Sequence, residues 1–359
     1  MSKFWSPIVE RLVPYTPGEQ PTHQTFIKLN TNENPYGPSP LAIDAIRVAT
    51  DDGLRLYPDP TAADLKHAIA STLKFDINHI FVGNGSDEVL AHSFNAFFHR
   101  TEPVLFADVT YSFYKTYCEL YALRYREVCL NEAFEYDTRD YCVPCGGIVI
   151  ANPNAPTGIG MRLESIEKIL TQNPDIVVIV DEAYVDFGGK SAVELVRRFE
   201  NLVVLQTFSK SRSLAGLRVG FAIAQPHLIE ALQWVKDSFN SYPVGRLALE
   251  GARAAWADHE WFEKTRQLVI ADRDRMSEGL KTIGFRVLPS ATNFIFAAHE
   301  SVPGEKLFAA LRSEGILVRH FSDDRTKNWL RISVGTSQDC ALLLESTRKI
   351  VAGAVERTG

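Results

Sequence analysis

The sequence predicts an α/β fold: a large domain built on a mostly parallel sheet covered by helices, with a smaller α+β domain beside it. Three observations lead to this prediction. The chain has 359 residues, more than one hydrophobic core usually holds. Short apolar, β-branched runs alternate with helix-like segments through most of the chain. The final third changes character, because its strand-like runs lie among amphipathic helices.

The apolar runs are the expected strands of the large sheet. They are unbroken rather than alternating, which is typical of strands that are buried on both faces. In open α/β sheets, ligands bind outside the carboxyl ends of the strands, so polar residues directly after these runs are the first candidates for a site. The runs are Ile80–Val82, Val104–Phe106, Gly147–Ile150, Ile176–Val180, Leu202–Leu205 and Val219–Ile223.

The final third supplies the expected small domain. Two strand-like runs, Ala291–Ala297 and Leu330–Val334, stand among helices such as Gly304–Ser313 and Cys340–Val355. The N-terminal segment has too few apolar residues for its own core, so we expect it to pack with the small domain across the mouth of the cleft. The predicted domains are a large one at 29–265 and a small one formed by 1–28 and 266–359.

The composition argues for a soluble, cytoplasmic protein. It is 45% hydrophobic and 23% charged, and no apolar stretch is long enough to span a bilayer, so we expect no membrane partner. The net charge is −6 and the Lys and Arg residues are scattered, so we expect no nucleic-acid partner. The N-terminus has no signal-peptide pattern, and five cysteines do not make a disulfide scaffold.

One cysteine pair has the spacing of a zinc or redox site. Cys142 and Cys145 form a C-x-x-C pattern, but no second Cys or His pair with ligand spacing accompanies them. We interpret them as two reduced thiols and expect no metal.

A glycine loop after the first strand could hold a phosphate. The run GNGSDE at 83–88 leads into a helical pattern. Glycines let the backbone approach an anion closely, and the free N–H groups of a first helical turn attract it. Ser86 or Asp87 is equally consistent with an ordinary N-cap, so the loop alone leaves both interpretations open.

The strand IVVIV ends in a carboxylate, Asp181, with a phenol, Tyr184, three residues later. A buried acid at the edge of a sheet needs a cationic partner. A protonated pyridine nitrogen would serve, because a nearby negative charge favours its protonated form. By themselves the same residues also fit a Walker-B-like acid or a helix cap.

The segment after the next strand decides between these interpretations. The run TFSKSRSLAGLRVG at 207–220 places Lys210 among small residues at a strand end, where partial desolvation favours a nucleophilic amine that attacks an aldehyde. Ser209 and Arg218 supply a hydroxyl and a fork of donors suited to phosphate.

This run resembles the lysine signature of the class II pyridoxal-phosphate-dependent aminotransferases, which have the aspartate aminotransferase fold (fold type I). The resemblance covers nearly the whole chain, and the short length and the opening NENPYGPSP are most similar to members that act on histidinol phosphate. It implies a mostly parallel seven-stranded sheet and pyridoxal 5'-phosphate as cofactor. The other motifs stand in the family's order: LNTNENPYGPSP (29–40), YPD (57–59), GNGSDE (83–88), TYSFY (110–114), NPNAPTG (152–158), DEAYVDF (181–187) and LRISVG (330–335).

The resemblance implies a catalytic role for three residues. Lys210 would bind the cofactor's aldehyde and act as base, Asp181 would pair with the pyridinium, and Tyr184 would bind the phenolic oxygen. Tyr57 would reach the phosphate of the neighbouring subunit, which implies a homodimer with shared active sites. Further residues implied for cofactor binding are Gly85, Ser86, Asp87, Tyr111, Asn154, Thr207, Ser209 and Arg218. Those implied for the substrate are Tyr15, Asn32, Arg319 and Arg331.

One position departs from the family pattern. Relatives usually have asparagine immediately before the Pro-Thr-Gly, whereas this chain has Ala155 there and Asn154 one residue earlier. The contact with the phenolic oxygen therefore either comes from Asn154 through a shifted loop or is left to Tyr184 alone.

The implied reaction moves an amino group from a small-molecule donor, expected to be histidinol phosphate, to 2-oxoglutarate. Arg319 and Arg331 favour a phosphorylated donor, although two arginines could also grip a dicarboxylate. An aromatic amino-acid (phenylalanine) aminotransferase and a phosphothreonine decarboxylase remain alternatives within the same fold. A non-catalytic cofactor-binding regulator is the alternative from a different class, but such proteins usually carry an added DNA-binding domain, and none fits before Leu29.

Overall fold

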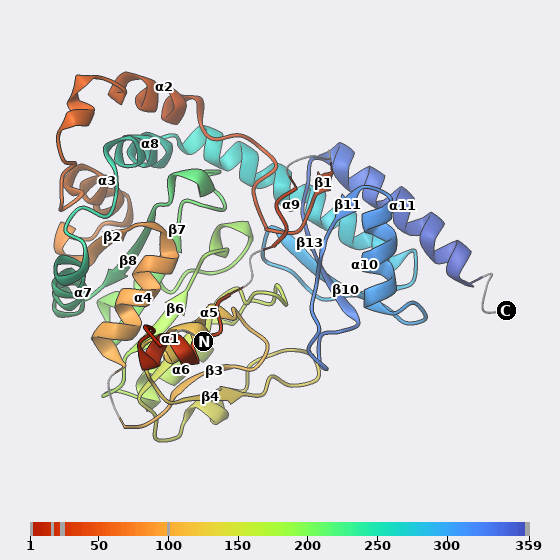
Figure 1. The fold of residues 1–359 in the computed structure, drawn as a ribbon, viewed down its shortest axis with the longest axis horizontal. Helices are drawn as coiled ribbons and strands as arrows, with labels where there is room; N and C mark the ends of the chain where they lie inside the picture. The colour runs from red at the N-terminus through yellow and green to blue at the C-terminus, as the bar shows by residue number, and fades with distance from the viewer. Residues whose placement is uncertain (1–2, 16–17, 22–25, 99–100, 356–359) are drawn as a thin grey trace.

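A computed structural model describes residues 3–15, 18–21, 26–98 and 101–355. Figure 1 shows a large domain and a smaller one, connected by the long helix α9 (His259–Lys281). The large domain holds a seven-stranded sheet, and the small domain holds a four-stranded antiparallel sheet. The predicted fold class, with its seven-stranded and mostly parallel sheet, is confirmed.

The large sheet is parallel except for one strand, β8, which runs antiparallel to both of its neighbours. In the order in which they lie side by side, the strands are β2 (Ile80–Gly83), β8 (Gly220–Ala224), β7 (Leu202–Thr207), β6 (Val178–Asp181), β5 (Gly147–Ala151), β3 (Val104–Ala107) and β4 (Tyr125–Val128). All but β4 overlap a predicted run. β4 was not predicted, because it is an edge strand whose central residues, Arg126 and Glu127, are exposed and so do not form an apolar run.

Different helices cover the two faces of this sheet. Successive strand residues point to opposite faces, so Ile148 and Val178 belong to one apolar core, and Val149 and Ile179 belong to the other. The first core is completed by α3 (Ala63–Leu73), α6 (Leu163–Gln172) and α8 (Arg246–Ala257). The second is completed by α4 (Gly85–Phe97), α5 (Phe113–Leu120) and α7 (Pro226–Phe239).

The shorter elements join these layers. Helix α2 (Pro40–Ala49) packs on α8 and begins after Ser39, whose hydroxyl accepts a hydrogen bond from the Leu41 backbone N at 3.1 Å. The remaining helical segments are α1 (Pro7–Arg11), η1 (Asp52–Arg55), η2 (Ile77–His79), η3 (Thr138–Tyr141), η4 (Val185–Phe187), η5 (Val193–Arg197) and η6 (Ala215–Leu217).

Only part of the N-terminal segment joins the small domain, because Tyr15 packs instead on Phe113 of the large domain, with 4.6 Å between the ring centroids. Strand β1 (Ile27–Lys28) pairs in parallel with β11 (Ile316–Leu317), and Leu29 enters the core of the small domain. The antiparallel sheet has the order β12 (Arg319–His320), β13 (Trp329–Ser333), β10 (Phe294–His299) and β9 (Phe285–Val287). Its helices are α10 (Gly304–Ser313) and α11 (Ser337–Val355).

Helix α9 ties the two domains together. It begins after Asp258, whose carboxylate accepts a hydrogen bond from the Trp261 backbone N at 3.1 Å, and it places Val269 and Met276 in the small-domain core. The proposed division between residues 265 and 266 falls inside this continuous helix.

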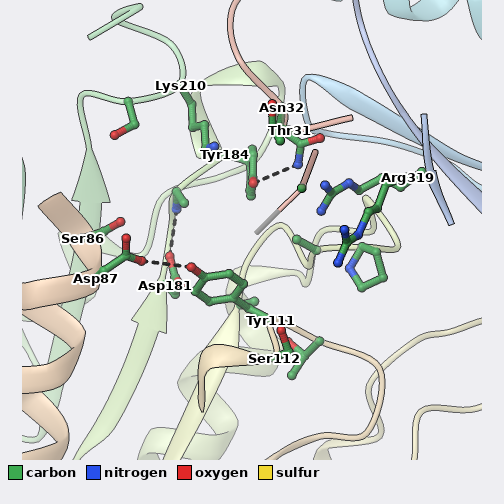
Figure 2. A pocket seen from close by; sticks show the side chains of 18 of the residues that line it. Thr31, Asn32, Ser86, Asp87, Tyr111, Ser112, Asp181, Tyr184, Lys210 and Arg319 are labelled. Carbon is green, nitrogen blue, oxygen red and sulfur yellow. Dashed lines mark hydrogen bonds between the residues drawn. The ribbon is translucent and has the colours of Figure 1, made fainter. Parts of the chain in front are cut away.

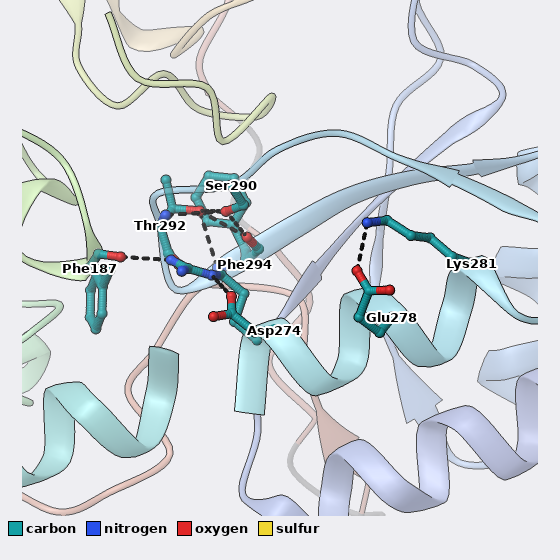
Figure 3. Close-up of polar contacts among 8 residues, drawn as sticks. Phe187, Asp274, Glu278, Lys281, Ser290, Thr292 and Phe294 are labelled. Carbon is teal, nitrogen blue, oxygen red and sulfur yellow. Dashed lines mark hydrogen bonds and ion pairs between the residues drawn. The ribbon is translucent and has the colours of Figure 1, made fainter. Parts of the chain in front are cut away.

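Buried Arg273, on α9, joins segments of both domains. Its Nη1 donates to the carbonyl oxygens of Phe187 (2.6 Å) and Thr292 (3.1 Å). Figure 3 shows Phe187 close to the turn that contains Ser290, Thr292 and Phe294. Ser290 Oγ donates to the Phe294 carbonyl at 2.6 Å, and the Phe294 N donates to Thr292 Oγ1 at 3.3 Å. These bonds close a turn, so β10 begins at Phe294 rather than at the predicted Ala291.

Two further properties bear on partners. None of the helices in the described part of the chain combines the length and the apolar character needed to cross a membrane. Cys142 is exposed and Cys145 is buried, and no disulfide joins them.

Candidate active site

A cavity of about 290 Å³ opens at the carboxyl edge of the large sheet, between this sheet, the N-terminal segment and the small domain. Figure 2 shows Ser86 and Asp87 on one side of it, Arg319 on the other, and Lys210 and Tyr184 between them. Of the predicted residues, those that line the cavity are Tyr15, Asn32, Ser86, Asp87, Tyr111, Asp181, Tyr184, Ser209, Lys210, Arg218, Arg319 and Arg331.

The connection between β7 and β8 supplies both Lys210 and Arg218. Because β8 is antiparallel to β7, this connection leaves and re-enters the sheet at the same edge. Thr207, at the end of β7, accepts a hydrogen bond from the Ser209 N at 3.1 Å, and so orients Ser209 without lining the cavity itself. Asn34 Nδ2 donates to the Lys210 carbonyl at 3.1 Å and fixes the backbone that carries the lysine.

The N-terminus of α4 and Arg218 together form a candidate anion site. Gly85 has a φ of +80°, and a Cβ there would lie 2.6 Å from Arg218 Nη2. Gly220 also allows close approach, since its Cβ would lie 2.4 Å from the Ser86 N. Arg218 contacts Asp87 Oδ2 at 2.8 Å and Ser209 Oγ at 3.4 Å. Backbone N–H groups, a hydroxyl and a guanidinium in one place suit a phosphate.

Asp181 ends β6 as a buried carboxylate in the wall of the cavity. Burial raises the pKa of Asp181, while the hydrogen bonds from Tyr114 Oη (2.7 Å) and the Ala183 N (3.1 Å) act in the opposite direction. A cation in the cavity would offset this desolvation. Sequence reasoning missed Tyr114. The available signal was the spacing of Tyr111 and Tyr114, which puts both phenols on one face of a helical turn.

Tyr111 offers an aromatic surface inside the cavity. Its hydroxyl donates to Asp87 Oδ1 at 2.9 Å, and burial raises its pKa well above the usual value. The phenol is therefore neutral and fixed, and its ring can pack against a planar ligand.

Two arginines of the small domain form a second candidate anion site. Arg319 on β12 pairs directly with Arg331 on β13, so two positive side chains lie side by side. Arg331 Nη2 donates to the Asn30 carbonyl at 2.9 Å, but its buried Nε has no hydrogen-bond partner among the described residues. Burial lowers the pKa of Arg331, and neighbouring Arg319 lowers it further. An anion bound between them would satisfy both charges.

The side chain of Asn154, a predicted cofactor ligand, does not line the cavity. The amide of Asn154 is buried, and both its oxygen and its nitrogen make hydrogen bonds to neighbouring protein groups. Its Oδ1 accepts from Thr110 Oγ1 at 2.8 Å, and its Nδ2 donates to the Val109 carbonyl (2.8 Å) and to Thr157 Oγ1 (3.1 Å). Ala155 lines the cavity at this point instead.

Tyr57 lies outside the cavity. It is 82% exposed, and its ring stacks on Tyr242 with 4.6 Å between the centroids. A role in the site of a neighbouring subunit stays a prediction. Gly85 also lies outside the lining, where it makes room for Arg218.

The residues present fit pyridoxal phosphate. Ser86, Ser209 and Arg218 would hold its phosphate, and Tyr111 would pack against the ring. The desolvated carboxylate of Asp181 would hold a protonated ring nitrogen, and Tyr184 would reach the phenolic oxygen. Lys210 would supply the amine that binds its aldehyde.

Comparisons with known proteins agree with this geometry. Residues 24–346 match the family model for aminotransferase class I and II. The chain is 55% identical to histidinol-phosphate aminotransferase from Acetobacter pasteurianus, over 98% of this chain and 99% of that protein. It is 56% identical to the protein of that name from Pseudomonas syringae pv. syringae, over 96% and 99%.

A solved structure shares the fold. Histidinol-phosphate aminotransferase from Sinorhizobium meliloti, in complex with pyridoxal-5'-phosphate, superimposes with a TM-score of 0.88 at 23% identity, over 98% of this chain and 99% of that one. The chain therefore belongs to the aminotransferase class I and II family.

Proposed function

We propose that this chain is a pyridoxal-phosphate-dependent aminotransferase of histidine biosynthesis, which transfers the amino group of histidinol phosphate to 2-oxoglutarate. The observation that carries the choice of donor is the pair Arg319 and Arg331, across the cavity from the anion site of Ser86 and Arg218. A cavity with an amine between two anion sites suits a phosphorylated cofactor on one side and a phosphorylated donor on the other. The names of relatives more than half identical to the chain support the same donor.

Each of three side chains has a separate role in the proposed reaction. Lys210 would bind the cofactor's aldehyde, give way to the donor's amine, and then move the proton from the donor's reacting carbon. Asp181 would keep the ring nitrogen protonated, and Tyr184 would donate a hydrogen bond to the phenolic oxygen. When bound, the cofactor supplies an electron sink for the electrons left on that carbon.

A spectroscopic comparison of donors tests this proposal. Histidinol phosphate, phenylalanine and phosphothreonine are added separately to the purified protein, and the visible absorbance of the bound cofactor is followed. We expect histidinol phosphate to deplete the visible band at a concentration at least about a hundredfold lower than phenylalanine does, because a buried ion pair is worth several kcal/mol. Addition of 2-oxoglutarate should restore the band.

Each alternative has its own result. Depletion by phenylalanine at equal or lower concentration would move the assignment to aromatic transamination. Release of carbon dioxide from phosphothreonine, without amino transfer to 2-oxoglutarate, would identify a decarboxylase. A visible band that no donor changes would identify a cofactor-binding protein without catalytic activity.

We also propose that the chain works as a cytoplasmic homodimer in which Tyr57 completes the partner's phosphate site. Tyr57 is exposed in the subunit and lies in a region with other exposed apolar side chains, including Leu54 and Leu56 of the same segment and its stacking partner Tyr242. Such a patch is typical of a surface that is covered by another chain.

Mixing two inactive variants tests the shared site. Tyr57→Ala and Lys210→Ala are each expected to be severely impaired. After the subunits are unfolded and refolded together, about a quarter of the wild-type activity should return, since half of the dimers are mixed and each of these has one intact site. Separately refolded variants are the control. If the mixture stays as inactive as its components although mixed dimers form, Tyr57 does not act across the interface.

A further inference from the structure

Asn32, from the N-terminal segment, contacts the hydroxyl of Tyr184. Its Nδ2 lies 3.0 Å from Tyr184 Oη, and both side chains line the cavity, as Figure 2 shows. Around them the wall offers little else for the phenolic oxygen, because Ala155 has no polar group and the amide of Asn154 is already used. The state of the Tyr184 hydroxyl therefore matters more here than in a site with an asparagine at the position of Ala155.

Hydrogen bonds fix both the backbone and the side chain of Asn32. It is 1% exposed and has a φ of 57°, a left-handed conformation that is uncommon for residues other than glycine. Its backbone N donates to Ser333 Oγ at 2.8 Å, and its carbonyl accepts from Asn293 Nδ2 at 3.0 Å. Ser333 Oγ also donates to Asn32 Oδ1 at 2.9 Å. A side chain fixed in this way can hold its neighbour in one orientation.

The direction of the bond to Tyr184 follows from Ser333. The Ser333 oxygen accepts the Asn32 backbone N–H, so its own proton needs an acceptor, and Asn32 Oδ1 is in place to accept it. With the amide flipped, the serine proton would face an NH₂ group inside a buried site. The NH₂ of Asn32 therefore faces Tyr184, and because that group only donates, Tyr184 Oη accepts. The phenol keeps its own proton for another partner.

We propose that Asn32 is a positioning residue that makes Tyr184 an acceptor on one side, so that its proton is directed into the cavity, toward the phenolic oxygen of the cofactor. This inference rests on the proposed cofactor site. In this arrangement the amide of Asn32 determines in which direction the Tyr184 hydroxyl donates its hydrogen bond.

The substitution Asn32→Asp tests the polarity while preserving the shape. One carboxylate oxygen can still accept from Ser333, but the other would accept the Tyr184 proton and turn it away from the cavity. The readout is the midpoint of the pH titration of the bound cofactor's visible absorbance, because a hydrogen bond to the phenolic oxygen favours the deprotonated form. Tyr184→Phe should raise the midpoint by about one pH unit or more, and Asn32→Asp should raise it by at least as much.

The double variant separates polarity from charge. An added carboxylate alone would raise the midpoint equally with and without the Tyr184 hydroxyl. If Asn32 acts through Tyr184, the shift caused by Asn32→Asp should shrink by at least half in the Tyr184→Phe background. Asn32→Ala, which adds no charge, should give a smaller increase that also depends on Tyr184, and it serves in place of Asn32→Asp if the buried charge prevents folding.

Asn293→Ala is the matched control. It removes a bond to the backbone of Asn32 but leaves the amide facing Tyr184, so the protein should lose thermal stability without a shift of the midpoint. Equal shifts for Asn32→Asp in both backgrounds, or no shift for Tyr184→Phe, would overturn the inference. A wild-type protein with no visible band would instead overturn the cofactor site on which it rests.

Discussion

Replacing Lys210 with alanine is expected to lower kcat by about four orders of magnitude or more, because one amine both binds the cofactor's aldehyde and moves the proton. The absorption band of the covalently attached cofactor should be replaced by that of the free aldehyde, since the covalent attachment is lost. Steady-state kinetics with histidinol phosphate and an absorption spectrum of the same preparation measure both effects. Arg218 and Ser86 remain, so the cofactor's phosphate should still bind.

Two variants make this result specific. Lys210→Arg keeps the positive charge but offers no amine to an aldehyde, so it should be as inactive as Lys210→Ala. Lys168→Ala removes an exposed lysine on α6 and should leave kcat and the spectrum unchanged. If Lys210→Ala keeps more than a tenth of the wild-type kcat, Lys210 is neither the attachment point nor the base.

Substitution of Asp181 by asparagine is expected to cost roughly two to four orders of magnitude in kcat/KM, because a buried ion pair with the ring nitrogen is worth about 3–5 kcal/mol. Asparagine preserves the shape but has only one acceptor oxygen, whereas Tyr114 and the Ala183 N donate to different oxygens of Asp181. One of these bonds is therefore lost together with the charge, and the Tyr114→Phe variant measures the hydrogen-bond part of the loss. The affinity of the apoprotein for pyridoxal phosphate should fall as well, which is measured by fluorescence titration.

The neighbouring acid provides the contrast. Glu182 is also buried, and burial raises its pKa to about 7, but it is outside the cavity and accepts from Ser191 Oγ (2.6 Å), the Ala192 N (2.5 Å) and Gln206 Nε2 (2.9 Å). Glu182→Gln should therefore lower stability with little effect on cofactor affinity. Tyr114→Phe, which removes one hydrogen bond to Asp181, should reduce kcat/KM by only about tenfold. Equal losses for Asp181→Asn and Tyr114→Phe would show that the charge of Asp181 is not what the site uses.

The sequence predicted the fold where burial is complete. The central strands are apolar throughout, so their runs stand out whatever the surroundings. β4 did not, because an edge strand with Arg126 and Glu127 exposed resembles a loop. The two-residue strands β11 and β12 are likewise too short to carry any periodicity and exist only through their pairing with β1 and β13.

The position of a candidate site residue was predictable where a local motif marks it, as with Lys210, which lines the cavity. The position of a side chain was less predictable where it depends on contacts with residues elsewhere in the fold. The spacing around Asn154 and Ala155 left two possibilities open, and the bonds of Asn154 to Thr110 and Val109 favour the one in which Tyr184 alone contacts the phenolic oxygen. The contact of Asn32 with Tyr184 joins residues far apart in the chain, and no local pattern reveals such a pair.

The antiparallel pairing of β7 with β8 brings Lys210 and Arg218 onto one connection, so the sequence of this connection and that of the small domain can evolve independently. Since residues 208–219 connect these strands at one edge, an insertion or deletion there would displace Lys210 and Arg218 together and damage both attachment and anion binding. Arg319 and Arg331 lie on a separate sheet in the other domain. If Arg319 and Arg331 hold the donor as proposed, changes in β12 and β13 would alter donor choice without displacing Lys210 or Arg218.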